Sequence, residues 1–146
     1  MIESGNIQDI DSVDAQINNH RRKHIQRNHT ATHLIHQALK DILGEHVQQS
    51  GSLVAPNSLR FDLTHYEQIS DDYIIEIEKQ VNTVILENLV VQTEMKDYKT
   101  AQNDGAVSLF GEKYRDVVRV VNIPGFSMEL CGGTHVNRTG DIGGLK

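Results

Sequence analysis

The stretch RNHTATHLIHQALKDIL, residues 27–43, has the strongest pattern in the sequence. Its apolar residues recur at spacings of three and four positions, which is the period of an amphipathic helix. These residues are Leu34, Ile35, Ala38, Leu39 and Ile42. Gly44 stands where a helix would end, and Asn18 or Asn19 could cap its start. The pattern predicts one long helix that ends at Leu43.

Extended segments are predicted on both sides of this helix. Residues 12–17 alternate between polar and apolar side chains, which is typical of a half-buried strand. Residues 47–62 contain the turn-forming pairs Ser50–Gly51 and Pro56–Asn57, which break the segment into short extended pieces. We therefore expect a pair of strands after the helix.

A second amphipathic helix is predicted after Ser70, which could cap it, and its end is expected near Asn88. Its apolar face should pack on a sheet. Further strands are predicted at Val90–Lys96, Asp116–Val121 and Phe126–Leu130. The order of these elements indicates an α+β fold, a two-layer domain with a mostly antiparallel sheet packed against two long amphipathic helices.

The composition is that of a single domain. The 146 residues are 38% hydrophobic, enough for one core, and we expect one domain over residues 1–146. Residues 140–146 stop while still resembling the approach to another strand. The sequence has no run of eighteen apolar residues and no signal-peptide pattern at its start, so we expect a soluble, cytoplasmic protein without a membrane partner.

The charge is acidic overall and basic in one place. The formal net charge of −6 argues against a chain that binds nucleic acid by electrostatics alone. His20–His24 and Arg27, which we call the basic segment, concentrate positive charge beside the histidine-rich part of the predicted helix. This segment is either a solvated helix start or a contact to a nucleic-acid backbone.

Two histidines of the predicted helix suggest a metal site. His29 and His33 are four residues apart, so they lie one above the other on one helical face, a geometry that suits a shared ion. Two ordinary surface histidines are the alternative, since this spacing also arises by chance. His36 lies about one turn further along and could support such a site.

The second half of the candidate site follows the last predicted strand. Cys131 is the only cysteine, which excludes an intrachain disulfide. Cys131 and His135 flank a loop whose glycines, Gly132 and Gly133, allow both side chains to reach one ion. Together with the helical pair they supply three imidazoles and one thiolate, a set that favours zinc over magnesium or calcium.

The same residues bear on three rival chemistries. A zinc peptidase of the His-Glu-x-x-His kind would need a glutamate where Thr30 stands, and a zinc deaminase would need a Cys-x-x-Cys arm. Both classes are excluded. A thiol hydrolase with Cys131 as nucleophile and His135 as base stays open, although it leaves the helical histidine pair unexplained.

Three blocks of the sequence closely resemble the editing domain of alanyl-tRNA synthetases. They are RNHTATHLIH (27–36), QSGSLV (49–54) leading to LRFD (59–62), and CGGTH (131–135) ending in RTGDI (138–142). The resemblance extends from about Ser12 to the last residue. Related domains occur in threonyl-tRNA synthetases and in free-standing deacylases. The Gly-Gly-Thr sequence between Cys131 and His135 is similar to the alanyl form. The chain looks like an excised piece of a synthetase, truncated at both ends.

The resemblance implies an ester hydrolase within an alanine–tRNA ligase. Its substrate would be the acceptor end of tRNA(Ala) mischarged with serine or glycine, and its partners would include the remaining domains of the synthetase. The resemblance also implies zinc as the cofactor. By residue match, the zinc ligands are His29, His33, Cys131 and His135.

The resemblance further places Thr32 and Gln49 in the amino-acid pocket, as catalytic and substrate-binding residues. The other substrate-binding candidates are Arg60, Asp62, Gly132 and Gly133. A pocket that bonds the hydroxyl of serine would disfavour alanine. Each candidate also has a structural alternative. Thr32 could bond its own helix backbone and Gln49 could be a turn residue. Arg60 and Asp62 could form a surface ion pair that contributes little.

The expected ligand set leaves two functions open. Four protein ligands close a tetrahedral zinc, which is typical of a structural site, whereas a hydrolytic zinc keeps one position open. The first function is zinc-dependent editing. The alternative is a non-catalytic, zinc-stabilised module that binds tRNA or supports the fold.

Overall fold

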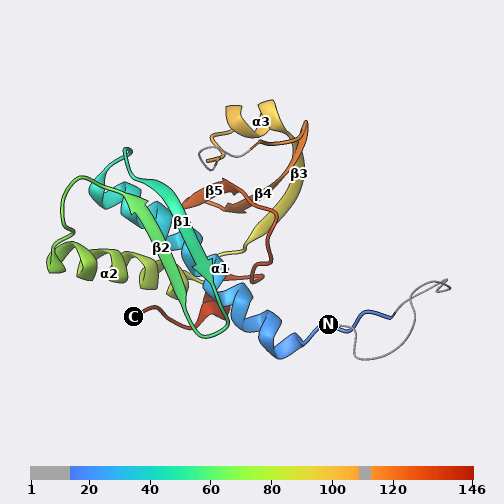
Figure 1. Cartoon of the computed structure of the whole chain (residues 1–146), viewed down its shortest axis with the longest axis horizontal. Helices are drawn as coiled ribbons and strands as arrows, with labels where there is room; N and C mark the ends of the chain where they lie inside the picture. Colours follow the sequence, from blue (N-terminus) through green and yellow to red (C-terminus); the bar gives the residue numbers. More distant parts are fainter. Residues whose placement is uncertain (1–13, 109–112) are drawn as a thin grey trace.

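The computed structural model describes residues 14–108 and 113–146. Helices and strands follow one another irregularly along the chain (Figure 1). In chain order they are α1 (Asn19–Leu43), β1 (Gln48–Val54), β2 (Leu59–Thr64), α2 (Asp71–Glu87), β3 (Gln92–Asp97), α3 (Tyr98–Asn103), β4 (Val117–Ile123), β5 (Ser127–Leu130) and the 3-10 helix η1 (Thr139–Ile142). The predicted α+β class is confirmed.

Helix α1 has the boundaries that its sequence predicts. The side chain of Asn18 accepts a hydrogen bond from the N–H of Arg21 at 2.9 Å, and the N–H of Gly44 donates to the carbonyl of Lys40 at 2.8 Å. Gly44 has a φ of 113°, a conformation that glycine adopts without strain. Both predicted caps are therefore confirmed.

Helix α2 is confirmed at both ends. Ser70 accepts from the N–H of Tyr73 at 3.3 Å, and Asn88 ends the helix in the left-handed conformation with φ 54°. The backbone of α2 lies nearest to α1 and η1. Val81 and the other buried residues of α2 share one core cluster with Leu34 of α1 and Val121 of β4.

The strands form two antiparallel sheets. β1 and β2 form a hairpin, in which Val54 lies opposite Leu59 and a register shift falls between Gln49 and Gly51. In the second sheet β4 is central, with β3 and β5 on its two sides. The predicted strand pair and the three later strands are confirmed, and the ends of the later strands differ from the prediction by at most two residues.

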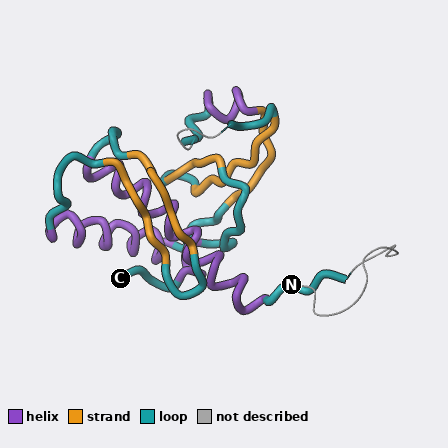
Figure 2. The backbone as a smooth tube through the Cα atoms, viewed as in Figure 1, coloured by secondary structure: helices purple, strands orange, loops and turns teal. Residues whose placement is uncertain are grey.

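Helix α1 lies between the other elements (Figure 2) and contacts the hairpin, β5, α2 and η1. Leu34 and Ala38 of α1 are fully buried in the main core, together with Val47 ahead of β1 and Val81 of α2. A smaller cluster around Val120 joins α3 to the second sheet. The middle of α1 is therefore held from several sides.

The predicted first strand is wrong over its described part. Residues 14–17 are exposed and lie in no strand, and residues 12–13 fall outside the described residues. An alternating pattern forms a strand only beside another strand, and no strand in the described part of the chain pairs with this segment. None of the described helices combines the length and the apolar character that crossing a membrane requires.

Two short elements also differ from the prediction. Residues 140–146 do not begin a strand, because η1 is tied to the end of α2: the buried Thr139 hydroxyl donates to the carbonyl of Val84 at 2.7 Å and accepts from the N–H of Leu89 at 2.8 Å. Helix α3 was not predicted from the sequence. Asp97 caps it by accepting a backbone N–H of the first turn at 3.0 Å.

Candidate functional site

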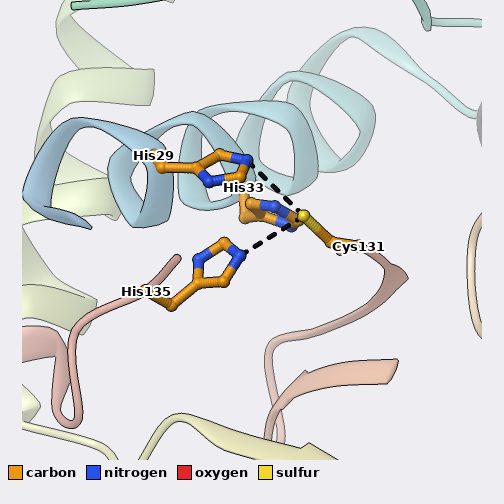
Figure 3. Close-up of side chains that lie close together, drawn as sticks. All are labelled: His29, His33, Cys131 and His135. Atoms are coloured by element: carbon orange, nitrogen blue, oxygen red, sulfur yellow. Dashed lines mark hydrogen bonds between the residues drawn. The ribbon is translucent and has the colours of Figure 1, made fainter. Parts of the chain in front are cut away.

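Helix α1 presents His29 and His33 on one face. Their ring centroids lie 5.3 Å apart, as expected for residues one helical turn apart. His33 is buried and His29 is half-buried. Both side chains lie toward the loop that follows β5, which carries Cys131 and His135 (Figure 3). The helix therefore supplies half of the candidate site and the loop supplies the other half.

The loop after β5 is tied to β4 by Arg119. The N–H of Cys131 donates to the carbonyl of Arg119 at 3.0 Å. The guanidinium of Arg119 donates back to the carbonyl of Cys131 at 3.1 Å and to that of Gly133. Sequence reasoning missed this arginine, because its partners are backbone atoms that no motif identifies.

The four predicted ligands meet at one point, and we call them the candidate metal group (Figure 3). The sulfur of Cys131 lies 3.5 Å from Nε2 of His29 and 3.3 Å from Nε2 of His135. One nitrogen or sulfur atom from each of the four side chains lies within 4.8 Å of the others. The group could hold one metal ion, and ligation itself stays a prediction.

The second ring nitrogen of two of these histidines has a polar partner of its own. Nδ1 of His29 lies 3.2 Å from the carbonyl oxygen of Thr134, and Nδ1 of His135 lies 3.2 Å from the hydroxyl of Thr30. The Thr30 hydroxyl is fully buried and also accepts the N–H of Val136 at 3.2 Å. These contacts leave Nε2 of each ring facing the sulfur, an orientation typical of metal-binding histidines.

Glu129 of β5 is the partner of the third histidine. Its Oε2 lies 2.7 Å from Nδ1 of His33, and its Oε1 lies 3.0 Å from Nδ1 of His36. All three side chains are buried. His36 thus contacts the residue that holds His33, and its supporting role stays a prediction. Sequence reasoning missed Glu129, and the available signal was a single acidic residue inside a short strand that is otherwise uncharged.

The buried carboxylate and its histidines shift one another's pKa. Burial alone would raise the pKa of Glu129, but His33 and His36 outweigh burial and lower it to about 2. Burial alone would lower the pKa of His33, but Glu129 and the sulfur of Cys131 raise it to about 10. Without a metal, Glu129 is therefore ionised and His33 is protonated at neutral pH.

Both titratable residues of the loop have a lowered pKa. Burial alone would raise the pKa of Cys131, but the hydrogen bonds from His135 and His29, together with His33, lower it to about 3. Burial lowers the pKa of His135. The cysteine is thus a thiolate and His135 is neutral at neutral pH, which are the protonation states that metal ligation requires.

A polar cavity of about 280 Å³ has His36, but no member of the candidate metal group, in its lining. Its lining includes Gln49, His36, and the ion pair between Lys40 and Glu45, in which Nζ and Oε2 lie 2.8 Å apart. Through His36 the cavity reaches Glu129, which in turn contacts the candidate metal group. Gln49 is therefore the predicted pocket residue that the structure brings to this cavity.

The other predicted substrate-binding residues are not gathered there. Thr32 is buried on α1, and its hydroxyl donates to the carbonyl of Asn28 at 2.8 Å, which is the structural alternative considered for it. Arg60 and Asp62 form an ion pair on β2, with Nε and Oδ1 3.1 Å apart and both side chains largely exposed. Within the described residues none of these side chains lines the cavity, and their roles stay predictions.

The basic segment lies near the candidate metal group. A second cavity, of about 230 Å³, has Lys23, Arg27 and His135 in its lining. Lys23 and Arg27 are one helical turn apart, and Nε of Arg27 donates to the carbonyl of Asp141 at 2.9 Å. Two cations and one candidate ligand thus share a cavity.

Several known proteins are similar to this chain in sequence. A family model described as the threonyl and alanyl tRNA synthetase second additional domain matches residues 118–146. The chain is 51% identical over 142 residues to an alanine–tRNA ligase of Pseudothermotoga lettingae, 54% over 145 to one of Thermoanaerobacter sp., and 49% over 146 to one of Clostridioides difficile. These alignments cover 97%, 99% and 100% of the chain but 17%, 16% and 17% of the ligases, so the chain spans about a sixth of their length.

Gly132 and Gly133 differ in the space that the structure leaves for a side chain. A Cβ at position 133 would lie 2.0 Å from Cε1 of His29, whereas a Cβ at position 132 would meet no atom within 4 Å. Gly133→Ala should displace the His29 ring and weaken the binding of Co²⁺, measured by its absorption spectrum, by roughly tenfold or more. Gly132→Ala is the control and should bind like the parent chain. Equal affinities in both variants would contradict this reading of the loop.

Proposed function

Since the chain matches a fragment of the alanine–tRNA ligases, we propose that it is an editing domain that hydrolyses the ester bond of tRNA(Ala) carrying serine or glycine. The observation that supports this most is the candidate metal group, linked through Glu129 and His36 to a polar cavity that contains Gln49. An activation site sized for alanine discriminates poorly against other small amino acids, so a second site must remove them. The reaction would take place in the cytoplasm, next to the remaining domains of the ligase.

The proposed metal is zinc, held by His29, His33, Cys131 and His135. Three imidazoles and one thiolate are a donor set that zinc prefers. The buried Glu129 supports this assignment, since a carboxylate at the second nitrogen of a ligating histidine fixes its tautomer and orientation. When bound, zinc would stabilise charge on the reacting ester or fix the pocket around it.

Gln49 is the proposed residue that orients the aminoacyl group and the attacking water. Its amide donates to the hydroxyl of Ser52 at 3.1 Å, and its carbonyl oxygen can accept from the hydroxyl of a bound serine. This contact favours serine over alanine, because alanine would leave the polar group unpaired. The hydroxyl of Thr32 could only accept a hydrogen bond from a substrate, because it donates its own proton to the carbonyl of Asn28. Positioning and charge stabilisation then suffice for ester hydrolysis.

The basic segment is the proposed contact to the tRNA backbone. The chain is acidic overall, so phosphate binding must rely on local cations. Lys23 and Arg27 line a cavity together with His135, which would put phosphates of the acceptor end close to the reacting ester. This arrangement favours the nucleic-acid reading of the segment over a merely solvated helix start.

A non-catalytic module is the second candidate function. It is favoured by the ligand set, because four protein ligands would close the coordination of a tetrahedral zinc. In that case the metal would join α1 to the loop after β5, and tRNA would bind without being hydrolysed. The two candidates differ in the role they give to Gln49, which the closed-site reading does not need.

Hydrolysis of seryl-tRNA(Ala) and alanyl-tRNA(Ala) by the zinc-loaded chain tests the editing function. The chain should release serine faster than alanine. Gln49→Ala should slow serine release by roughly tenfold, the effect of one lost hydrogen bond in the transition state, with the zinc content unchanged. Gln68→Ala, which removes an exposed glutamine away from the cavity, is the matched control. Equal, zinc-independent loss of both amino acids would reject the hydrolase and favour the module.

The protonation of His33 predicts how metal affinity depends on pH. The raised pKa of His33 keeps its ring protonated at pH 8 in the metal-free chain, while Cys131 is already a thiolate. Metal binding must therefore displace one proton, so affinity should rise about tenfold per pH unit around pH 8. Glu129→Gln removes the charge that raises this pKa and should flatten the dependence.

Calorimetric titration with zinc in two buffers of different ionisation enthalpy counts the released protons. The parent chain should release about one proton at pH 8, and Glu129→Gln should release fewer. An affinity of the parent chain that does not change with pH would contradict the proposed protonation of His33.

A further inference from the structure

Three aromatic rings gather on the surface where β1 begins and β2 ends. His46 precedes β1, while His65 and Tyr66 follow β2. Gln48 pairs with Thr64 in the antiparallel hairpin, so the residues just beyond this pair come together. The three rings belong neither to the candidate metal group nor to the lining of the cavity at Gln49.

His46 and His65 form a nearly flat plate. Nε2 of His46 lies 2.9 Å from Nδ1 of His65. The ring centroids are 5.1 Å apart and the ring planes differ by 23°. With the nitrogens in contact at this centroid spacing, the two rings meet edge to edge in almost one plane. This contact joins the ends of β1 and β2.

Tyr66 stacks over this plate. Its ring centroid lies 4.7 Å from that of His46 and 5.0 Å from that of His65, with interplanar angles of 26° and 28°. Such distances and angles are typical of offset stacking. Tyr66 is nevertheless 77% exposed. The contact between His46 and His65 has a structural role, because it joins the ends of β1 and β2. That contact does not need the exposed ring of Tyr66.

The surroundings of the rings indicate what kind of ligand would fit. A cavity of about 490 Å³ is lined by the three rings together with Leu63 and Thr64. No side chain in this lining is a lysine, arginine, aspartate or glutamate. Recognition here would therefore depend on flat aromatic faces rather than on phosphate charge. Stacking on aromatic side chains is how proteins hold unpaired nucleobases.

We propose that His46, His65 and Tyr66, the aromatic platform, stack an unpaired nucleobase of the tRNA acceptor strand. This inference rests on the proposed function for its ligand. The platform shares a turn with the proposed aminoacyl cavity, because Glu45 and Val47 on either side of His46 both line that cavity. If the 3′ end of a tRNA occupies this cavity, the unpaired bases beside it would lie near this turn.

Binding of fluorescent, unacylated tRNA(Ala) to the zinc-loaded chain tests the platform. Tyr66→Ala should weaken binding by roughly tenfold, the effect of losing one stacked base, and Tyr66→Phe should restore it. Tyr73→Ala is the matched control, since Tyr73 is an exposed tyrosine on α2 outside the platform. The loss in Tyr66→Ala should be the same at low and high salt, because this substitution removes no charge.

A tRNA that lacks its single-stranded 3′ end tests whether Tyr66 contacts the unpaired bases or another part of the tRNA. The truncated tRNA should bind the parent chain and Tyr66→Ala equally well. Three results would overturn the platform: no binding of intact tRNA by the parent chain, equal affinity of the parent chain and Tyr66→Ala for intact tRNA, or a second zinc ion per chain that is lost in His65→Ala. Because binding is measured without hydrolysis, an inactive chain whose intact-tRNA affinity depends on Tyr66 would refute the hydrolase and keep the platform.

Discussion

The buried carboxylate of Glu129 is the contact on which the site depends. It is 6% exposed and lies between His33 and His36 on α1. An ionised carboxylate in such a place is tolerated only with close partners, and removing either partner leaves an uncompensated charge. Strand β5 and the middle of α1 must therefore stay in one relative position. The loop that begins at Cys131 follows β5 directly, so the position of β5 also fixes where this loop starts.

Helix α1 serves several parts of the proposed function at once. One face carries two members of the candidate metal group, and the next turn carries His36, which lines the cavity at Gln49. Toward its start, Lys23 and Arg27 face a second cavity that His135 also lines. Beyond its end lies His46 of the aromatic platform. A tRNA end that reached the cavity would thus meet cations on one part of the helix and stacking rings near its end.

Elements with local signals could be predicted from the sequence. The caps of α1 and α2 lie in the sequence beside the apolar period, so Asn18 and Ser70 locate both helices. Residues 14–17 show the limit of such patterns, because alternation predicts a strand only where another strand is available. Helix α3 was missed because its signal is a single capping residue, Asp97. Division of the strands into two sheets depends on long-range packing and has no local signal.

In the candidate site, too, residues with a local sequence signal could be predicted and long-range contacts could not. Residue type and spacing, together with the resemblance to editing domains, identified the four side chains that the structure brings together. The contacts that orient them could not be predicted. Glu129 is 93 residues from His36, and Thr30 is 105 residues from His135. Such pairs follow from how β5 and its loop dock on α1, which only the folded chain specifies.

X-ray absorption at the zinc edge, recorded on the purified chain with a measured metal content, tests the central claim most directly. One zinc ion per chain should have three nitrogen neighbours at about 2.0–2.1 Å and one sulfur at about 2.3 Å. A zinc spectrum without sulfur in its first shell, or a chain that binds no zinc at all, would contradict the account.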